Sequence, residues 1–149
     1  MPDFEWQPIV LTLKLAIITT IVLLIIGIPL AYYLAYSRNK LKVIPDAVIS
    51  LPLVLPPSVM GFYFLVIFSP ESFIGKVLLN IFGIKLVFTF TGVLIASIIF
   101  SLPFMIEPLK TGFLSIPSEL KAASYTLGKT RIYTLFRVLL PNMKPSLLS

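Results

Sequence analysis

Three long stretches without a charged residue constrain this chain more than any other feature of its sequence. They cover residues 15–36, 47–69 and 86–106. A helix of about 20 residues is roughly 30 Å long, which is the thickness of the hydrocarbon core of a bilayer. Only 12% of the 149 residues are charged, against about 25% in a typical soluble domain. The sequence therefore predicts a polytopic membrane protein with three spans.

The spans are expected to be α-helices, because an open sheet would leave backbone N–H and C=O groups unsatisfied in lipid. A signal peptide is the alternative for the first stretch. It would need a basic start and a shorter apolar segment, whereas this chain begins with Asp3 and Glu5. Residues 71–85 are too short and too charged to cross, and they predict a loop with a short helix at the surface.

The distribution of Lys and Arg predicts the orientation of the spans. If residues 37–46 and 107–145 face the cytoplasm, that side holds nine Lys and Arg residues and the other side holds three. Cytoplasmic loops of membrane proteins carry the excess of Lys and Arg. The N-terminus, with Asp3 and Glu5, is therefore expected outside. The net charge of +6 is explained by this distribution, and we expect no nucleic-acid partner.

The residue types exclude several kinds of chemistry. The chain has no cysteine and no histidine. It therefore has no disulfide, no Cys/His metal site, no cysteine nucleophile and no histidine base. We expect no catalytic residues, no bound metal and no cofactor.

Residues 123–130 read Ala-x-x-x-x-Gly-Lys-Thr, a loose version of a phosphate-binding loop. Such a loop follows a buried strand and is rich in glycine, so that backbone N–H groups can wrap the phosphates. Here residues 116–127 contain good helix formers instead, and Gly128 stands where a left-handed residue ends a helix. Thr130 can cap a second helix over about 131–140, which is expected to stop at Pro141. The pattern predicts a helix, a glycine turn and a helix.

Three interpretations of this hairpin are open: a solvated hairpin, a DNA-binding helix-turn-helix, and a hairpin that docks on a partner or on the chain's own helices. Its basic residues would suit phosphate contacts, but it follows directly from a membrane span. A stripe of apolar side chains outside the membrane favours docking. These side chains are Leu120, Ala123, Leu127, Ile132, Leu135, Phe136, Val138 and Leu139.

Residues 117–145 resemble the cytoplasmic loop of binding-protein-dependent ABC-transporter permeases. The signature of that family reads Glu-Ala-Ala, three residues, Gly, nine residues and Ile-x-Leu-Pro. Gly128 is followed here by nine residues and then by Val138, Leu139, Leu140 and Pro141. The first part of the family signature is not matched, because Ala122, Ala123 and Ser124 stand in place of Glu-Ala-Ala. Glu119 lies one turn earlier and could make a similar polar contact.

Three further stretches are similar to molybdate permeases: "LPLVLPPSVMGFYFLV" at 51–66, "FGIKLVFTFTGVLIAS" at 82–97 and "SLPFMIEPLKTGFLSIP" at 101–117. The resemblance implies ATP-driven import of molybdate across a bacterial or archaeal plasma membrane, with tungstate or sulfate as alternatives. It also implies three partners: a separate ATPase subunit, an extracytoplasmic substrate-binding protein and a second permease copy.

The resemblance implies that the hairpin at 118–140 couples the permease to the ATPase. The residues that would contact it are Glu119, Ala122, Ala123, Ser124, Gly128, Val138, Leu140 and Pro141. The small side chains allow close approach to a partner surface, while plain helix propensity is the alternative reason for them.

A translocation path is expected in the second span, at Pro56, Pro57, Ser58 and Gly61. The two prolines break the helical hydrogen-bond ladder, and broken helices near mid-membrane commonly line water-filled paths. A kinked helix packed on lipid or on a neighbour is the alternative.

Members of this family continue beyond the coupling loop with further spans. We therefore expect residues 1–149 to form a single permease domain that is incomplete at its C-terminus. Two other functions stay open at this point. One is a membrane protein that docks the ATPase without transporting, and the other is a nucleotide-binding enzyme, suggested only by Gly128, Lys129 and Thr130.

Overall fold

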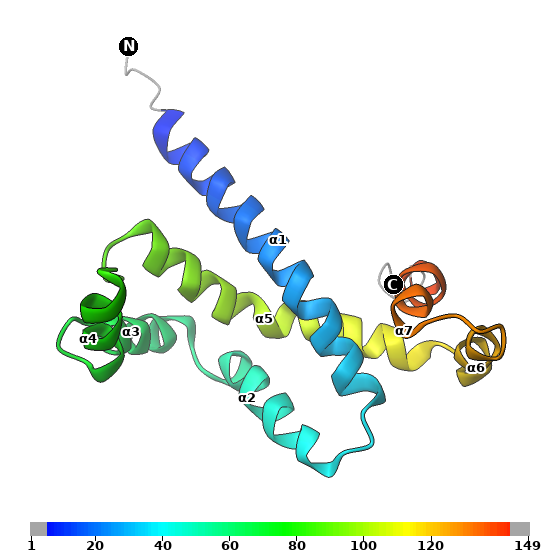
Figure 1. The fold of residues 1–149 in the computed structure, drawn as a ribbon. Coiled ribbons are helices and arrows are strands. Elements are labelled where there is room, and N and C mark those ends of the chain that lie inside the picture. Colours follow the sequence, from blue (N-terminus) through cyan, green and yellow to red (C-terminus); the bar gives the residue numbers. More distant parts are fainter. Residues whose placement is uncertain (1–5, 144–149) are drawn as a thin grey trace. The chain divides into compact units, whose positions relative to one another are not determined.

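A computed structural model describes residues 6–143, with the exception of the side chain of Phe82. Asp3, Glu5 and Lys144, which contribute to the charge distribution, lie outside the described residues. Every regular element within the described range is helical, which confirms the predicted all-α fold (Figure 1).

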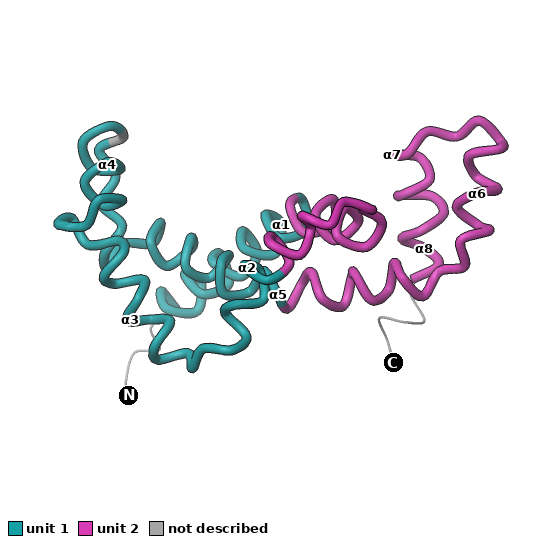
Figure 2. The backbone as a smooth tube through the Cα atoms, turned by 90° about the horizontal axis from the view of Figure 1, so that it is seen from below, with its two compact units in different colours: residues 1–25, 47–103 teal, residues 26–46, 104–149 magenta. Residues whose placement is uncertain are grey.

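The chain contains six helices of nine residues or more and a series of shorter turns in its described part. In chain order they are α1 (Trp6–Tyr36), η1 (Lys40–Lys42), α2 (Val43–Val54), α3 (Pro57–Phe68), α4 (Phe73–Phe82), α5 (Phe90–Ser115), α6 (Ser118–Thr126), α7 (Arg131–Thr134), η2 (Leu135–Leu139) and α8 (Leu140–Asn142). η1 is a 3-10 turn and η2 is a π-helical turn. The elements form two compact units (Figure 2), one made of residues 1–25 and 47–103 and the other of residues 26–46 and 104–149.

Two of the described helices, α1 and α5, are long and apolar enough to cross a membrane. They have 31 and 26 residues. Both extend beyond the uncharged stretches, because a helix continues through charged residues until its backbone is interrupted. α5 passes Glu107 and ends only at Ser115, shortly before Pro117, which disfavours a helical conformation in the residue before it.

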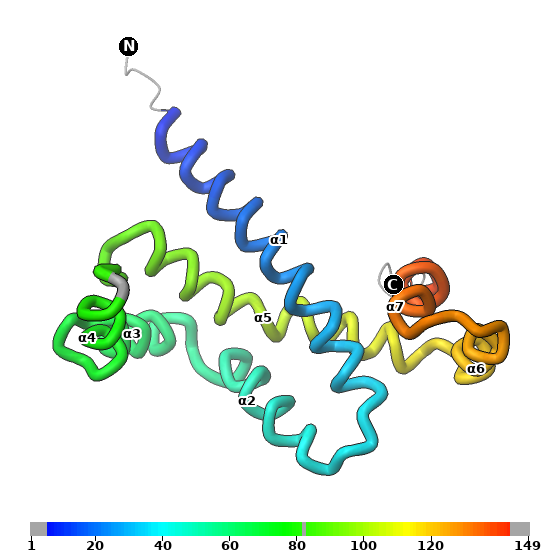
Figure 3. Tube along the Cα trace, viewed as in Figure 1, coloured from blue at the N-terminus to red at the C-terminus, as the bar shows by residue number. Residues whose placement is uncertain are grey.

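The stretch expected to form the second span is divided between α2 and α3, which are bent by 115° at the break between them (Figure 3). Pro56 is the N-cap of α3 and Pro57 is its first residue. Neither has a backbone N–H, so α2 cannot propagate through them. The break at these two prolines is confirmed. The pair forms either a broken span or a re-entrant loop, and the arrangement of three spans stays a prediction.

The predicted short helix within residues 71–85 is α4. It begins at Ser72, whose Oγ accepts the N–H of Gly75 at 2.9 Å. It ends at Gly83, whose φ of 64° is left-handed. Each end is thus fixed by a local cap.

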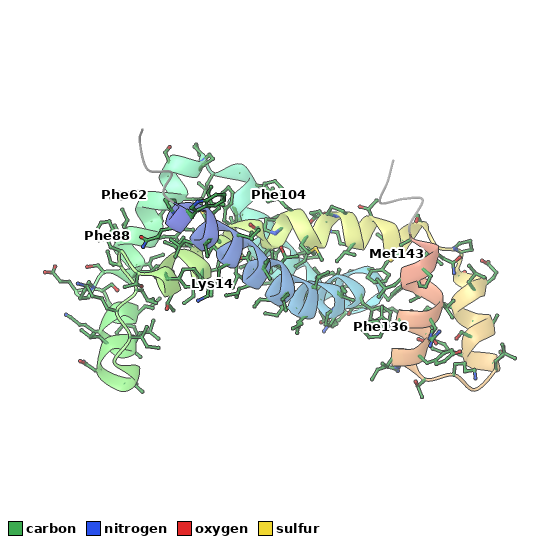
Figure 4. The ribbon with its side chains drawn as sticks, turned by 90° about the horizontal axis from the view of Figure 1, so that it is seen from above. Lys14, Phe62, Phe88, Phe104, Phe136 and Met143 are labelled. Atoms are coloured by element: carbon green, nitrogen blue, oxygen red, sulfur yellow. The ribbon has the colours of Figure 1, made fainter. Side chains whose placement is uncertain are left out.

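The core of the second unit joins the C-terminal ends of α1 and α5 to the last turns of the chain. Its buried apolar side chains include Ala31, Leu34, Ile106, Leu109, Phe113, Leu139 and Met143. Met143, labelled in Figure 4, packs closely over α5: a Cβ built on Gly112 would lie 2.7 Å from its Cε atom. This contact holds the end of the hairpin against α5.

Candidate functional site

The hairpin of α6 and α7–α8 is fixed at its turn by backbone hydrogen bonds. Figure 2 shows its two arms running side by side. Gly128 has a φ of 72°. Its N–H donates to the carbonyl of Tyr125 at 3.0 Å, and the N–H of Lys129 donates to the carbonyl of Ser124 at 3.1 Å. This pair of bonds is a Schellman motif, which confirms the predicted left-handed glycine after the first helix.

The second arm of the hairpin starts as predicted but ends differently. Thr130 caps α7, since its Oγ1 accepts the N–H of Tyr133 at 3.3 Å. The expectation that this helix stops at Pro141 is wrong, because α8 continues to Asn142. Leu139 and Leu140 have right-handed helical backbone angles, so the helical segment continues from the π-helical turn at 135–139 into α8 and contains Pro141.

A hydrogen bond between two buried hydroxyls joins the two arms. The Oγ of Ser124 lies 2.8 Å from the Oγ1 of Thr134, and the residues are 5% and 0% exposed. Thr134 Oγ1 also donates to the carbonyl of Thr130 at 2.9 Å. Ser124, which stands where the family signature has an alanine, therefore uses its hydroxyl inside the hairpin. This pair was not predicted, because its only signal in the sequence is a Ser and a Thr on either side of a glycine turn.

The other residues predicted for coupling lie on this hairpin with different exposures. Glu119, Ala122, Ala123 and Pro141 are exposed, while Val138 and Leu140 are half-buried. The most exposed apolar side chains of the hairpin are Leu127 and Ile132, at 75% and 72%. They flank the Gly128 turn, so the tip of the hairpin presents an apolar surface. Both residues belong to the apolar stripe predicted from the sequence, but that prediction did not distinguish them from the other residues of the stripe.

The residues predicted for the translocation path lie in the first unit and are only partly brought together. Pro57 and Gly61 line a cavity of about 390 Å³ between α3, the loop at 86–88 and the start of α5. Ser58 is exposed and does not line it. The only side-chain hydroxyl among the residues given for this cavity is that of Ser97. The cavity is thus apolar and offers no cation to an anion.

One ion-pair cluster in the second unit joins the first turn of α2 to α5. Lys110 Nζ lies 2.8 Å from Asp46 Oδ1 and 2.9 Å from Glu107 Oε1. The lysine side chain is 18% exposed and the two carboxylates are 38% and 35% exposed. Among residues 6–143, no group of three or more His, Cys, Asp or Glu side chains could hold a metal ion.

Comparison with known proteins shows which family and which relatives the chain resembles. A sequence model described as "Binding-protein-dependent transport system inner membrane component" matches residues 24–149. The chain is 42% identical over 150 residues to the molybdenum transport system permease protein ModB of Azotobacter vinelandii, and it is 33% identical over 148 residues to ModB of Escherichia coli. It is also 34% identical over 140 residues to a probable sulfate transport system permease protein of Chlorokybus atmophyticus. These alignments cover 100%, 99% and 94% of this chain and 66%, 65% and 49% of the relatives. The chain therefore spans about two thirds or less of the length of these relatives.

Proposed function

Because the chain belongs to the family of binding-protein-dependent transport system inner membrane components, we propose that it is the permease subunit of an ATP-driven molybdate importer. The observation that carries this proposal is its similarity, along nearly its full length, to permeases named for molybdenum transport. The family is one of membrane transporters and not a catalytic family. In the proposed importer, a separate ATPase subunit binds and hydrolyses ATP.

The hairpin from Ser118 to Leu140 is the proposed contact with that ATPase. Its turn is closed by the Schellman motif at Gly128, and its arms are joined by the Ser124–Thr134 bond. In the proposed coupling, a hairpin held in this way would move as a rigid body. The exposed Leu127 and Ile132 supply the apolar surface that would enter a groove on the partner.

The proposed orientation follows from the basic residues. The second unit contains eight Lys and Arg residues and three Asp and Glu residues between positions 26–46 and 104–143. By the positive-inside rule, this excess supports a cytoplasmic hairpin and an N-terminus on the outside. A substrate-binding protein would then deliver the anion from outside. A second permease copy would complete the path, in which Pro56, Pro57, Ser58 and Gly61 of the broken α2–α3 segment take part.

A permease for sulfate is the second candidate, and its support is the identity to probable sulfate permeases. Uptake by cells that lack their own molybdate and sulfate permeases and produce this protein with its ATPase and binding protein distinguishes the two. We expect ATP-dependent accumulation of molybdate that a tenfold excess of sulfate does not reduce. Accumulation of sulfate without molybdate would refute the proposed substrate. Stable binding of the ATPase with no uptake of either anion would favour a docking protein.

Docking can be tested separately by copurification of the ATPase with the detergent-solubilised protein. Leu127→Ser and Ile132→Ser should each weaken binding about tenfold or more, since burying such a side chain contributes about 1.5–3 kcal/mol. Leu114→Ser is the matched control, because Leu114 is 61% exposed and lies on α5, outside the hairpin. Equal retention of the ATPase by all three variants would show that the tip does not dock.

A further inference from the structure

A cavity of about 330 Å³ lies in the second unit, where the last turns of α1 meet the hairpin. Its lining includes Tyr32, Tyr33, Tyr36, Lys121, Tyr125 and Arg131. This volume is at the lower end of the range of roughly 300–1,000 Å³ that is typical of small-molecule sites. Unlike the apolar cavity of the first unit, it combines phenol groups with two cations.

The tyrosine walls of this cavity are held in place by their own contacts. The hydroxyl of Tyr36 donates to the carbonyl of Phe113 at 2.8 Å. The hydroxyls of Tyr32 and Tyr125 lie 3.2 Å apart, and the rings of Tyr32 and Tyr36 meet edge-on with centroids 5.0 Å apart. One bond between Tyr32 and Tyr125 uses only one of their two phenolic hydrogens. The other hydrogen can donate to an oxygen atom in the cavity.

The lining of the cavity includes two cations, Lys121 and Arg131, and no carboxylate. Lys121 Nζ lies 3.5 Å from the ring centroid of Tyr36 and 5.3 Å from that of Tyr32. These cation–π contacts orient the ammonium group but leave its charge uncompensated. The salt bridges found among residues 6–143 all involve Lys110, so neither Lys121 nor Arg131 is neutralised in this way.

The position of the cavity along the chain identifies the kind of anion that reaches it. Tyr36 is the last residue of the uncharged stretch at 15–36 and of α1, so the cavity lies where a membrane-crossing helix leaves the hydrocarbon. Tyrosine side chains gather at that depth, beside the lipid headgroups. Basic pockets at the ends of membrane helices bind acidic headgroups. A free tetrahedral oxyanion in the cytosol has the same chemistry, but it lacks the local concentration that the bilayer gives to a lipid.

We propose that this cavity binds the phosphate group of an anionic phospholipid between Lys121 and Arg131, with the Tyr32–Tyr125 pair as a hydroxyl donor. The bound headgroup would link α1 to α6 and α7, and it would hold the hairpin against the end of α1. The proposal needs only the membrane setting, and it stands whether the transported anion is molybdate or sulfate.

Native mass spectrometry of the purified protein in a mild detergent tests the proposal without any transport assay. Dioleoylphosphatidylglycerol should remain bound, while dioleoylphosphatidylcholine should not. Loss of each cation should weaken retention about fivefold, and loss of both about 25-fold, by the usual contribution of a basic residue near a headgroup. The test variant is Lys121→Gln with Arg131→Gln. The control is Lys129→Gln with Arg137→Gln, which removes two exposed charges of the same hairpin outside the cavity.

Conservative variants keep the test decisive if the glutamine variant fails to fold. Lys121→Arg and Arg131→Lys preserve both charges and should retain phosphatidylglycerol as the unmodified protein does. Equal retention by the glutamine variant and its control would overturn the proposal, and so would equal binding of phosphatidylcholine. Equilibrium dialysis with inorganic phosphate or molybdate forms the other arm. Saturable binding of either ion, with no preference for phosphatidylglycerol, would assign the cavity to a free oxyanion and refute the lipid.

Discussion

Removal of the hydroxyl contact between Ser124 and Thr134 should loosen the hairpin by an amount that depends on which side chain is truncated. In Ser124→Ala, Thr134 keeps its bond to the carbonyl of Thr130 at 2.9 Å, so no buried polar atom is orphaned. The cost should be that of one ordinary hydrogen bond, about 0.5–1.5 kcal/mol. In Thr134→Val, the buried hydroxyl of Ser124 loses its partner, and the cost should be about 1–3 kcal/mol.

The double variant Ser124→Ala with Thr134→Val gives the sharpest part of this prediction. Replacing both partners of a buried hydrogen bond by apolar groups is nearly neutral, whereas leaving one partner alone costs its desolvation. The double variant should therefore be more stable than Thr134→Val by about 1 kcal/mol. Valine matches threonine in shape and in its restricted χ1, so the comparison isolates the hydroxyl.

Hydrogen exchange of backbone amides measures this local stability in the membrane protein, because it reports the free energy of opening for each segment. A change of 1 kcal/mol corresponds to about a fivefold change in exchange rate at 118–140. The amides of α4 in the first unit serve as the internal control and should not respond. If the two single variants loosen the hairpin equally and their effects add in the double variant, the two hydroxyls do not interact and the reasoning is refuted.

Two further predictions concern packing and charge. Gly92→Ala should lower the melting temperature sharply, because its Cβ would collide with the backbone of Leu86. Gly61→Ala should leave the melting temperature unchanged, because nothing lies within 4 Å of a Cβ there. Scanning fluorimetry of the two variants compares the same change at two sites of one unit. Lys110→Met should cost about 1 kcal/mol or less, since its partners are partly exposed. Added salt should reduce the difference in unfolding free energy between the unmodified protein and Lys110→Met, because salt screens the ion pairs. If the difference persists in 1 M salt, packing of the lysine stem and not its charge contributes the stability.

The features that the sequence predicted correctly are those set by neighbouring residues. Gly128 and Thr130 act through bonds that reach at most five positions along the chain. Pro56 and Pro57 interrupt a helix as an adjacent pair without N–H groups, whereas the single prolines Pro29 and Pro52 lie inside α1 and α2. Such signals need no tertiary information. Pro141 misled because a proline can lie inside a helical segment that continues past it, as Pro29 and Pro52 also do.

The features that the sequence did not reveal join residues that are far apart in the chain. Tyr32 and Tyr125 are separated by 93 positions, and Lys110 and Asp46 by 64. Hydrophobic periodicity and capping motifs carry no information about which side chains meet at such separations. The basic and aromatic cavity is a consequence of these contacts, so it becomes visible only when α1 and the hairpin are folded together.

The two kinds of contact have different consequences for the proposed coupling. Local bonds at Gly128 and Thr130 make the hairpin stiff, but stiffness alone would not move a membrane helix. The long-range contacts of Met143 with α5 and of Lys121 and Tyr125 with the end of α1 connect the hairpin to the helices that enter the bilayer. A displacement of the tip by a bound ATPase can then pass to these helix ends through packed side chains. Substitutions at the tip should therefore weaken docking, whereas substitutions at these attachments should leave docking intact and reduce transport per ATP hydrolysed.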